Sequence, residues 1–442
     1  MATIAHPMRA ALRWPAFGLG MGRDIDLLVL ANLFWGIGNG FYTYLLPLYV
    51  ARLGADPTQI GLVLALTSVV QALVYIPAGI LADRLGRKPL MLFGWALGPV
   101  AMLVFSLAGT WQQLLPGVAL LAAVAWSAPA YHSYIAASVG SRDMSHVFLM
   151  MFLGATAGAT LSAPVGGWLG ETAGLRWVFP AALIAYALST VVIALLRPQP
   201  RYRPPAAETV AAPAHPSGST GAARARPRRL RLRWDALPEV WSGTLAAALV
   251  LVAILMFATN LAQPFAPNWL VEAYGFSPTD IGQFGALSAL GGAALAVALG
   301  RLQRRRGAQW ALPLATAGLL AHAVLLLVAA SWPVAIAAYL LRGVFSALPS
   351  LAVAIVAGVL TAQTAQTEGT PGGRRMGLGF ALFNTSNAVA LTLSTYAAGW
   401  LYGQWAPLPF ITSAALLAPL LWGSWFAADR IARTTPTSTV GS

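Results

Sequence analysis

The stretch GILADRLGRKP, residues 79–89, lies between two long apolar runs and gathers Asp83, Arg84, Arg87 and Lys88 within six positions. Only 9% of the 442 residues are charged, and the mean hydropathy is +0.69. Soluble domains usually carry about a quarter charged residues. The cluster therefore marks a short polar connection between two segments that cross a membrane.

Apolar runs long enough to span a bilayer, roughly 20 residues each, recur along nearly the whole chain. They lack the alternation of outer-membrane barrel strands. The pattern predicts an all-α polytopic membrane protein with twelve helices, at about 27–50, 58–82, 89–109, 114–138, 146–169, 177–196, 242–266, 278–300, 309–330, 333–358, 377–401 and 407–427. The first run exceeds a signal-peptide core, so we expect it to remain as the first helix. The chain has no cysteine, which excludes disulfides and thiolate metal sites, and no metal or cofactor is expected.

The net charge of +14 follows the predicted topology. With the first helix starting in the cytoplasm, 24 of the 27 Lys and Arg residues fall in cytoplasmic segments. The other side holds Arg52 and Arg176, and Arg342 lies inside a helix. This asymmetry is what the positive-inside rule expects, so nucleic acid is not an expected partner. We predict an integral protein of a plasma (inner) membrane, with both termini cytoplasmic.

An internal repeat divides the chain. Residues 54–61, GADPTQIG, recur as GFSPTDIG at 275–282, an offset of 221, and GGWL at 166–169 recurs as AGWL at 398–401. Two parallel six-helix halves follow. The predicted organisation is a cytoplasmic segment 1–25, a half 26–196, a disordered basic linker 197–238, a half 239–428 and a cytoplasmic tail 429–442. The linker ends in RARPRRLRLR, 224–233, which either binds anionic lipid headgroups or serves only as a positive-inside anchor.

The charged stretch resembles the loop 2–3 signature of the major facilitator superfamily, G-x-L-a-D-r-x-G-r-k, and matches it at every fixed position. The resemblance implies a twelve-helix secondary transporter of a small molecule, not an enzyme, that works by alternating access. It also implies a gating motif, formed here by Gly79, Asp83, Arg84, Gly86, Arg87 and Lys88, with a second copy at Gly300, Arg304 and Gly307.

In the family, the acid of this motif is thought to hold the cytoplasmic side shut from the N-terminal end of helix 11. Asp83 can do this and Arg304 cannot, so the lock is expected on one side only. The alternative is that Asp83 only pairs with neighbouring arginines in a solvated turn.

By the same resemblance, helices 1, 4, 7 and 10 line a central cavity. The candidate substrate-binding residues on these helices are Asn32, Trp35, Asn39, Tyr42, Trp126, Tyr131, His132, Asn260, Gln263, Arg342 and Ser346. Polar side chains in hydrocarbon are costly unless they face the bundle interior. Each amide can equally serve as an inter-helix hydrogen bonder.

Two functional interpretations remain open. The first is proton-coupled export of hydrophobic or amphipathic molecules by antiport, which the aromatic, acid-poor cavity favours, with His132 as a candidate proton carrier. The second is uptake or exchange of a small polar or anionic solute captured by Arg342, unless that residue is a structural clamp. A transport-dead receptor or scaffold of the same fold is a third alternative. The only lysine, Lys88, lies in no G-K-[ST] motif, which argues against an ATP-driven pump. The glycine cluster 36–40 is interpreted as helix packing, and a monomer is expected.

Overall fold

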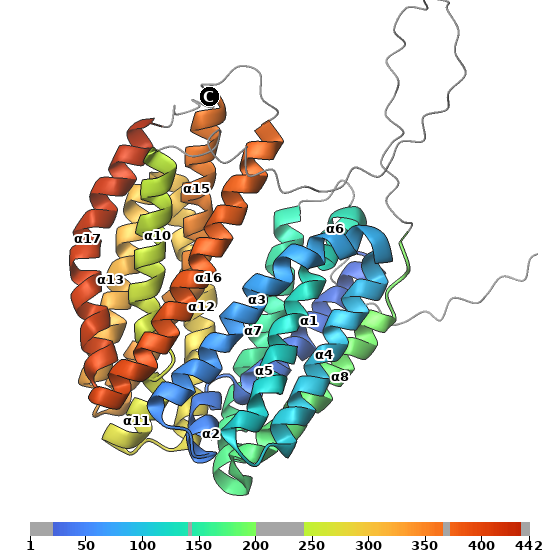
Figure 1. Ribbon diagram of the computed structural model, residues 1–442, viewed down its shortest axis with the longest axis vertical. Helices are drawn as coiled ribbons and strands as arrows, with labels where there is room; N and C mark the ends of the chain where they lie inside the picture. Colours follow the sequence, from blue (N-terminus) through green and yellow to red (C-terminus); the bar gives the residue numbers. More distant parts are fainter. Residues whose placement is uncertain (1–20, 140–143, 200–242, 366–371, 435–442) are drawn as a thin grey trace, which may run out of the picture. The chain divides into compact units, whose positions relative to one another are not determined.

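The computed structural model describes residues 21–139, 144–199, 243–365 and 372–434, and the regular elements within these ranges are all helices (Figure 1). Most of the predicted N-terminal segment, most of the basic linker and the end of the tail lie outside these ranges. The side chains of residues 75–85 also lie outside the description.

The helices of the first part of the chain are α1 Arg23–Tyr42, α2 Leu46–Arg52, α3 Pro57–Leu85, α4 Arg87–Leu107, α5 Leu114–Ala123, α6 Ala128–Val139, α7 Met144–Leu169 and α8 Val178–Ala194. The second part contains α10 Gly243–Leu261, α11 Ala266–Tyr274, α12 Pro278–Arg306, α13 Ala308–Leu327, α14 Trp332–Arg342, α15 Leu348–Ala365, α16 Gly372–Gln404 and α17 Leu408–Thr434. Short 3-10 turns join α5 to α6 (η2, Val124–Ser127) and α14 to α15 (η6, Gly343–Ser346).

The predicted all-α membrane fold is confirmed. When α1 with α2, α5 with α6, α10 with α11 and α14 with α15 are each counted as one segment, the described residues form twelve helical segments at the predicted positions. Nine stretches of the described chain are long and apolar enough to cross a membrane, and one of them, His146–Ala194, contains both α7 and α8. In α17 the apolar part, Leu408–Gly423, is shorter.

Four of the helices predicted as continuous are interrupted, and a proline follows each interruption. A proline lacks the N–H that would bond the carbonyl four residues earlier, so the α-helical ladder breaks there. The prolines are Pro47 after α1, Pro129 after η2, Pro267 after α10 and Pro349 after η6. Mid-helix 3-10 turns often mark functional hinges. Two of the predicted cavity residues, Trp126 and Ser346, lie on such turns.

Glycines at equivalent repeat positions adopt the same backbone conformation. Gly54 has φ 86° and Gly275 has φ 72°, and each precedes a long helix. Gly86 and Gly307 have φ 87° and 86°, each directly before the next helix. A positive φ is strained for residues with a Cβ atom, which explains why glycine occupies both copies.

Both copies of the G-x-x-P-T-x-I-G repeat also begin their helix with the same reciprocal cap. The Asp56 N–H donates to Gln59 Oε1 at 3.0 Å, and the Gln59 N–H donates back to Asp56 Oδ1 at 2.9 Å. In the second copy the Ser277 N–H donates to Asp280 Oδ2 at 2.9 Å, and the Asp280 N–H donates to Ser277 Oγ at 3.3 Å. A proline at the first helical position completes each capping box. The repeat therefore encodes a helix start.

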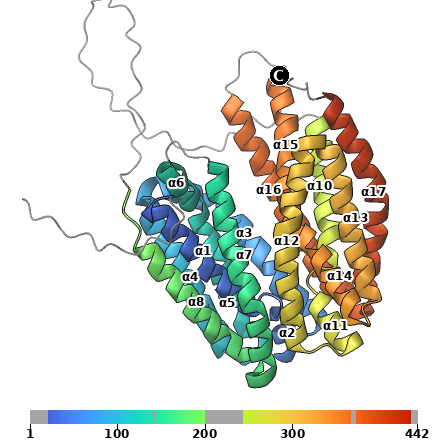
Figure 2. The same cartoon turned by 180° about the vertical axis from the view of Figure 1, so that it is seen from behind.

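The described residues form two compact units. The first contains α1, α2, α4 to α8, the end of α3 from Pro77 and the start of α12 to Leu290. The second contains the first part of α3, from Ala55 to Ile76, with α10, α11, the rest of α12 and α13 to α17. In the first unit α1 packs against α7 and α8, and in the second α13 packs against α17 (Figure 2). The predicted division into contiguous halves at 26–196 and 239–428 stays a prediction.

Glycines let α1 and α7 approach each other closely. A Cβ atom on Gly36 would lie 2.0 Å from the carbonyl oxygen of Ala155, and one on Gly158 would lie 2.2 Å from that of Leu33. Small residues permit this backbone contact between membrane helices. The interpretation of the 36–40 glycine cluster as helix packing is confirmed.

Two further glycine pairs join the repeated motifs. In the second unit a Cβ on Gly61 of α3 would lie 3.0 Å from the Cα of Gly399 on α16. In the first unit a Cβ on Gly282 of α12 would lie 3.0 Å from the Cα of Gly167 on α7. Each G-x-x-P-T-x-I-G copy thus packs its last glycine against the glycine of a G-W-L motif.

Candidate functional site

Hydrogen bonds connect the polar face of α1 to α6 and α7 in the first unit. The Asn32 Nδ2 donates to the Tyr131 hydroxyl at 2.9 Å and to the carbonyl of Leu28 at 2.7 Å. The Tyr131 hydroxyl lies 3.0 Å from the sulfur of Met151. The structure therefore brings the predicted site residues Asn32 and Tyr131 together.

An aromatic cluster continues from this contact. The ring of Trp35 lies 4.2 Å from that of Tyr186 and 5.5 Å from that of Trp95, measured between centroids. The Trp95 ring lies 5.4 Å from the ring of Tyr131. The Trp95 indole N–H donates to Ser189 Oγ at 3.0 Å. We define Trp35, Trp95, Tyr131 and Tyr186 as the aromatic cluster.

Two members of the aromatic cluster, Trp95 and Tyr186, are absent from the predicted site. They lie on α4 and α8, which are not among the helices that the resemblance assigns to the cavity. Their residue types could have indicated this position, because a Trp N–H or Tyr O–H within a membrane helix needs a hydrogen-bond partner and therefore faces the protein interior.

Tyr42 and Asn39 hold α1 against α8. The Tyr186 hydroxyl donates to Asn39 Oδ1 at 2.8 Å, and the Tyr42 and Tyr186 hydroxyls lie 3.0 Å apart. Tyr42 is 4% exposed and Tyr186 is fully buried. These contacts are structural, and substrate binding by Asn39 and Tyr42 stays a prediction.

Trp126 and His132 occupy different environments at the α5–α6 break. The indole N–H of Trp126 is buried and has no hydrogen-bond partner among the described residues. Its ring lies 6.1 Å from that of Phe93. His132 is exposed, with its ring 5.6 Å from Tyr131 and 5.7 Å from Phe148. His132 therefore adjoins the aromatic cluster through Tyr131.

In the second unit Asn260 joins α10 to α16. Its Nδ2 donates to Ser394 Oγ at 2.7 Å and to Thr395 Oγ1 at 2.8 Å, and the residue is 8% exposed. These bonds are typical of inter-helix contacts between buried polar side chains.

Arg342 contacts the break between α10 and α11. Its Nε donates to Gln263 Oε1 at 2.8 Å, and its Nη2 donates to the Gln263 carbonyl at 3.2 Å. That carbonyl is the one left without its helical donor by Pro267, four residues later. The guanidinium also lies 5.2 Å from the ring centroid of Tyr339. Arg342 therefore clamps the helix break. Ser346 is exposed, and its Oγ donates to the carbonyl of its own turn at 2.7 Å.

The predicted substrate-binding residues thus fall into one group in each unit. Their meeting in a single cavity stays a prediction. Of the predicted gating motif, Gly79, Asp83 and Arg84 lie in the last turns of α3, but their side chains are among those outside the description. In the second copy, Gly300 and the exposed Arg304 lie in α12.

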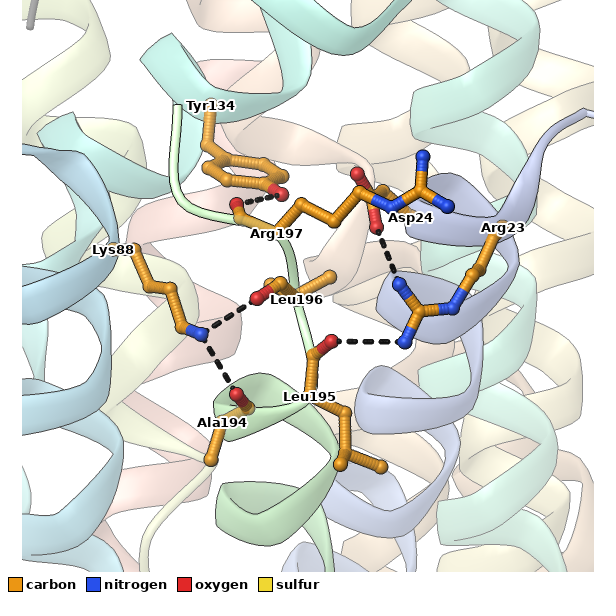
Figure 3. A network of polar contacts seen from close by, with 8 residues as sticks. All are labelled: Arg23, Asp24, Lys88, Tyr134, Ala194, Leu195, Leu196 and Arg197. Atoms are coloured by element: carbon orange, nitrogen blue, oxygen red, sulfur yellow. Dashed lines mark hydrogen bonds and ion pairs between the residues drawn. The ribbon is translucent and has the colours of Figure 1, made fainter. Parts of the chain in front are cut away.

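Lys88, from the gating motif, caps the end of α8. Its Nζ donates to the carbonyl of Ala194 at 2.8 Å and to that of Leu196 at 2.6 Å (Figure 3). The last carbonyls of a helix lack intrahelical donors and carry partial negative charge. The single lysine of the chain therefore has a structural contact that the motif alone did not predict.

Other helices contribute to the same cap. The Arg23 Nη2 donates to the carbonyl of Leu195 at 3.2 Å, and its Nη1 lies 3.8 Å from Asp24 Oδ1. The Tyr134 hydroxyl donates to the carbonyl of Arg197 at 2.8 Å. Figure 3 shows these donors around the end of α8. The cap ties α1, α4 and α6 to the point where the chain leaves the first unit.

Solved structures with the same fold cover more than nine-tenths of the chain. The nucleoside transporter NupG matches with a TM-score of 0.66 and 13% identity, covering 93% of this chain and 99% of that one. A POT family transporter in complex with 5-aminolevulinic acid matches with a TM-score of 0.69 and 12% identity, covering 94% and 98%. At this identity the likeness concerns the fold alone.

Sequence relatives match part of the chain. An uncharacterized MFS-type transporter of Mycobacterium tuberculosis is 31% identical over 192 residues, which are 41% of this chain and 43% of that protein. The multidrug resistance protein MdtG of Yersinia enterocolitica is 34% identical over 140 residues, 30% of this chain and 34% of the relative. The chain thus spans less than half the length of these relatives. A family model described as Major Facilitator Superfamily matches residues 28–356 and 248–441. The chain belongs to the Major Facilitator Superfamily.

Proposed function

We propose that this protein is a secondary transporter that exports hydrophobic or amphipathic small molecules by alternating access. The observation that carries the proposal is the aromatic cluster with Asn32 beside it. Within the described residues, these side chains hydrogen-bond to amide, hydroxyl, thioether and backbone groups and to no carboxylate. Mostly apolar surfaces with a few placed polar groups are typical of small-molecule sites.

The named relatives support the same substrate class. MdtG proteins of several bacteria carry the name multidrug resistance protein, and they match this chain at 32–35% identity. Aromatic faces accept varied apolar ligands by stacking and burial, which fits a transporter of several compounds.

The competing function, uptake or exchange of an anionic solute, would require the Arg342 guanidinium to contact substrate. Its Nε and Nη2 both donate to Gln263, and its Cζ lies 5.2 Å from the ring centroid of Tyr339. Two of the five N–H donors of this guanidinium are therefore engaged in holding the α10–α11 break, which gives Arg342 a structural role. The contacts therefore favour export over anion uptake.

Further parts of the proposal concern energy coupling and gating. We place His132 as the carrier of a coupling proton, because it is exposed and adjoins the aromatic cluster through Tyr131. Asp83 holds the cytoplasmic gate from the end of α3. The transporter works as a monomer in the inner membrane, as an antiporter with both termini in the cytoplasm.

The test is dye efflux from proteoliposomes by Trp35→Leu, with Trp422→Leu as the matched control. Trp422 lies on α17, is 72% exposed and belongs to no described cluster. We expect Trp35→Leu to lower the flux of an amphipathic dye such as ethidium at least about tenfold, since a stacking surface is lost. Equal flux in the two variants, at matched amounts of folded protein, would refute the proposal.

Two further measurements separate the alternatives. If Arg342→Gln leaves the transport of every polar and anionic solute in a panel unchanged, uptake or exchange of an anionic solute through Arg342 is excluded. If an imposed pH gradient leaves dye flux unaltered, proton coupling is excluded, whereas the proposal of export is unaffected.

A further inference from the structure

A pocket of about 330 Å³ lies in the first unit, at the opposite end of α8 from the Lys88 cap. The end of α2, the turn after α4 and the turn before α8 form its walls. Its lining includes Tyr49, Arg52, Ala108, Gly109, Gly174 and Arg176. None of these residues belongs to the aromatic cluster or to the predicted substrate site.

The two arginines of this pocket are exceptional in the chain. Of 27 Lys and Arg residues, the predicted topology leaves Arg52 and Arg176 on the non-cytoplasmic side. Basic residues are disfavoured there by the positive-inside rule. Residues 124 positions apart in sequence nevertheless line the same small pocket. Both side chains are exposed, and within the described residues neither has a carboxylate partner within ion-pair distance.

The structural contacts of Arg176 leave most of its guanidinium available. Its Nε donates to the carbonyl of Ser106 at the end of α4. The Tyr49 hydroxyl donates to the neighbouring carbonyls of Phe105 and Ala108 at 3.0 and 3.4 Å. The negative end of α4 is therefore already satisfied by protein donors. A guanidinium has five N–H donors, and capping α4 uses one of them.

Helix α8 adds positive potential to the same place. Arg176 lies two residues before Val178, the first residue of α8. A helix N-terminus carries partial positive charge and favours an anion, whereas a cation there is unfavourable. Two arginines and a helix N-terminus thus converge without an acidic partner among the described residues.

We propose that this pocket binds a phosphate group, either of a soluble phosphate compound or of a lipid headgroup. A guanidinium group matches the oxygen geometry of phosphate, and two of them line this pocket. The pocket lies at the lower end of the size range of small-molecule sites, which suits a phosphate with a small organic substituent. The site is separate from the proposed export site.

The test measures thermal stability of the purified full-length protein against sodium phosphate, at constant ionic strength kept with sodium chloride. A ligand that binds the folded state raises the melting temperature in a saturable way. We expect Arg52→Gln to raise the half-saturating phosphate concentration at least about tenfold, because a charge-assisted contact is lost. The Arg52 side chain makes no hydrogen bond to another described residue, so folding is expected to survive.

The matched control is Arg305→Gln, which removes one exposed positive charge from the last turn of α12. Its phosphate response should equal that of the unchanged protein. If phosphate does not stabilise the protein, or if Arg52→Gln responds as Arg305→Gln does, the proposal is overturned.

Lipid nanodiscs separate the two sources of phosphate. Phosphate stabilisation that persists in discs with and without phosphatidylglycerol supports a soluble ligand. Stabilisation that is seen in phosphatidylcholine discs and disappears when phosphatidylglycerol is added, in an Arg52-dependent way, supports a headgroup. Phosphatidylcholine also carries a phosphate in its headgroup, so stabilisation that is seen in detergent but in neither disc also supports a headgroup.

Discussion

Replacing Gly158 by alanine tests whether the α1–α7 contact is as close as the backbone indicates. The added Cβ would lie 2.2 Å from the Leu33 carbonyl oxygen and 2.7 Å from the Ile37 nitrogen. Both are backbone atoms of α1, so no side chain can rotate away. Ordinary contact begins at 3.4 Å, and the two helices must therefore separate by about 1 Å.

Two opposing contributions set the size of the effect. Alanine is more favourable than glycine within a helix by about 1 kcal/mol. Overpacking of a dense interface costs about 1–3 kcal/mol, and rigid backbone contacts put this case in the upper part of that range. We expect net destabilisation of about 1–2 kcal/mol, which lowers the melting temperature by roughly 2–8 °C for a unit of this size.

The assay is thermal unfolding of the purified protein, followed by tryptophan fluorescence. The matched control is Gly358→Ala in α15, where an added Cβ meets no atom within 4 Å. That variant should melt at or slightly above the temperature of the unchanged protein. A Gly158→Ala protein that melts with or above the control would refute the close contact.

Three further predictions follow from the caps and from the gating motif. Lys88→Met should lower the free energy of unfolding by about 1–2 kcal/mol, as measured by thermal unfolding. The loss is smaller than that of two fully buried charged hydrogen bonds, because the bond to Ala194 is exposed to water. Asp83→Asn should shift the population toward cytoplasm-open states. Spin-label distances across the cytoplasmic gate that do not change would contradict the lock. Hydrogen bonds from Thr279 and then Ser277 hold the pKa of the Glu171 carboxyl, in the connection between α7 and α8, below its usual range. This contact stabilises the fold above the unfolded pKa and is lost as the pH falls through the lowered folded value. The protection factors of the amides in residues 275–282, corrected for the intrinsic pH dependence of exchange, should therefore fall on acidification, and Glu171→Gln should abolish that fall.

Much of the fold could be predicted because a bilayer imposes a simple rule on sequence. Every spanning segment must satisfy its backbone internally and present apolar side chains, so apolar runs predict helices directly. The repeat at 54–61 and 275–282 added the helix starts, and the same capping box occurs in both copies. The helix breaks were missed because hydropathy alone does not register prolines such as Pro47 and Pro267.

The candidate site could be predicted only in part, because the spacing of residues within one helix does not determine which distant helix they contact. Asn32 and Tyr131 were both expected to face the interior, and they bind each other. Trp95 came from a helix outside the expected set. The role of Lys88 depends on where α8 ends, 106 residues later, and a motif cannot show that.

The two glycine pairs have a consequence for how the chain arose and how it can be divided. Gly61, in the first copy of G-x-x-P-T-x-I-G, contacts Gly399, in the second copy of the G-W-L motif. Gly282, in the second copy of G-x-x-P-T-x-I-G, contacts Gly167, in the first copy of the G-W-L motif. A symmetric dimer of one half that carried both motifs would form the same two contacts. Each half of the present chain still carries one face of both interfaces. Two separately expressed halves would therefore be obligate partners, with each supplying the glycine that the other needs.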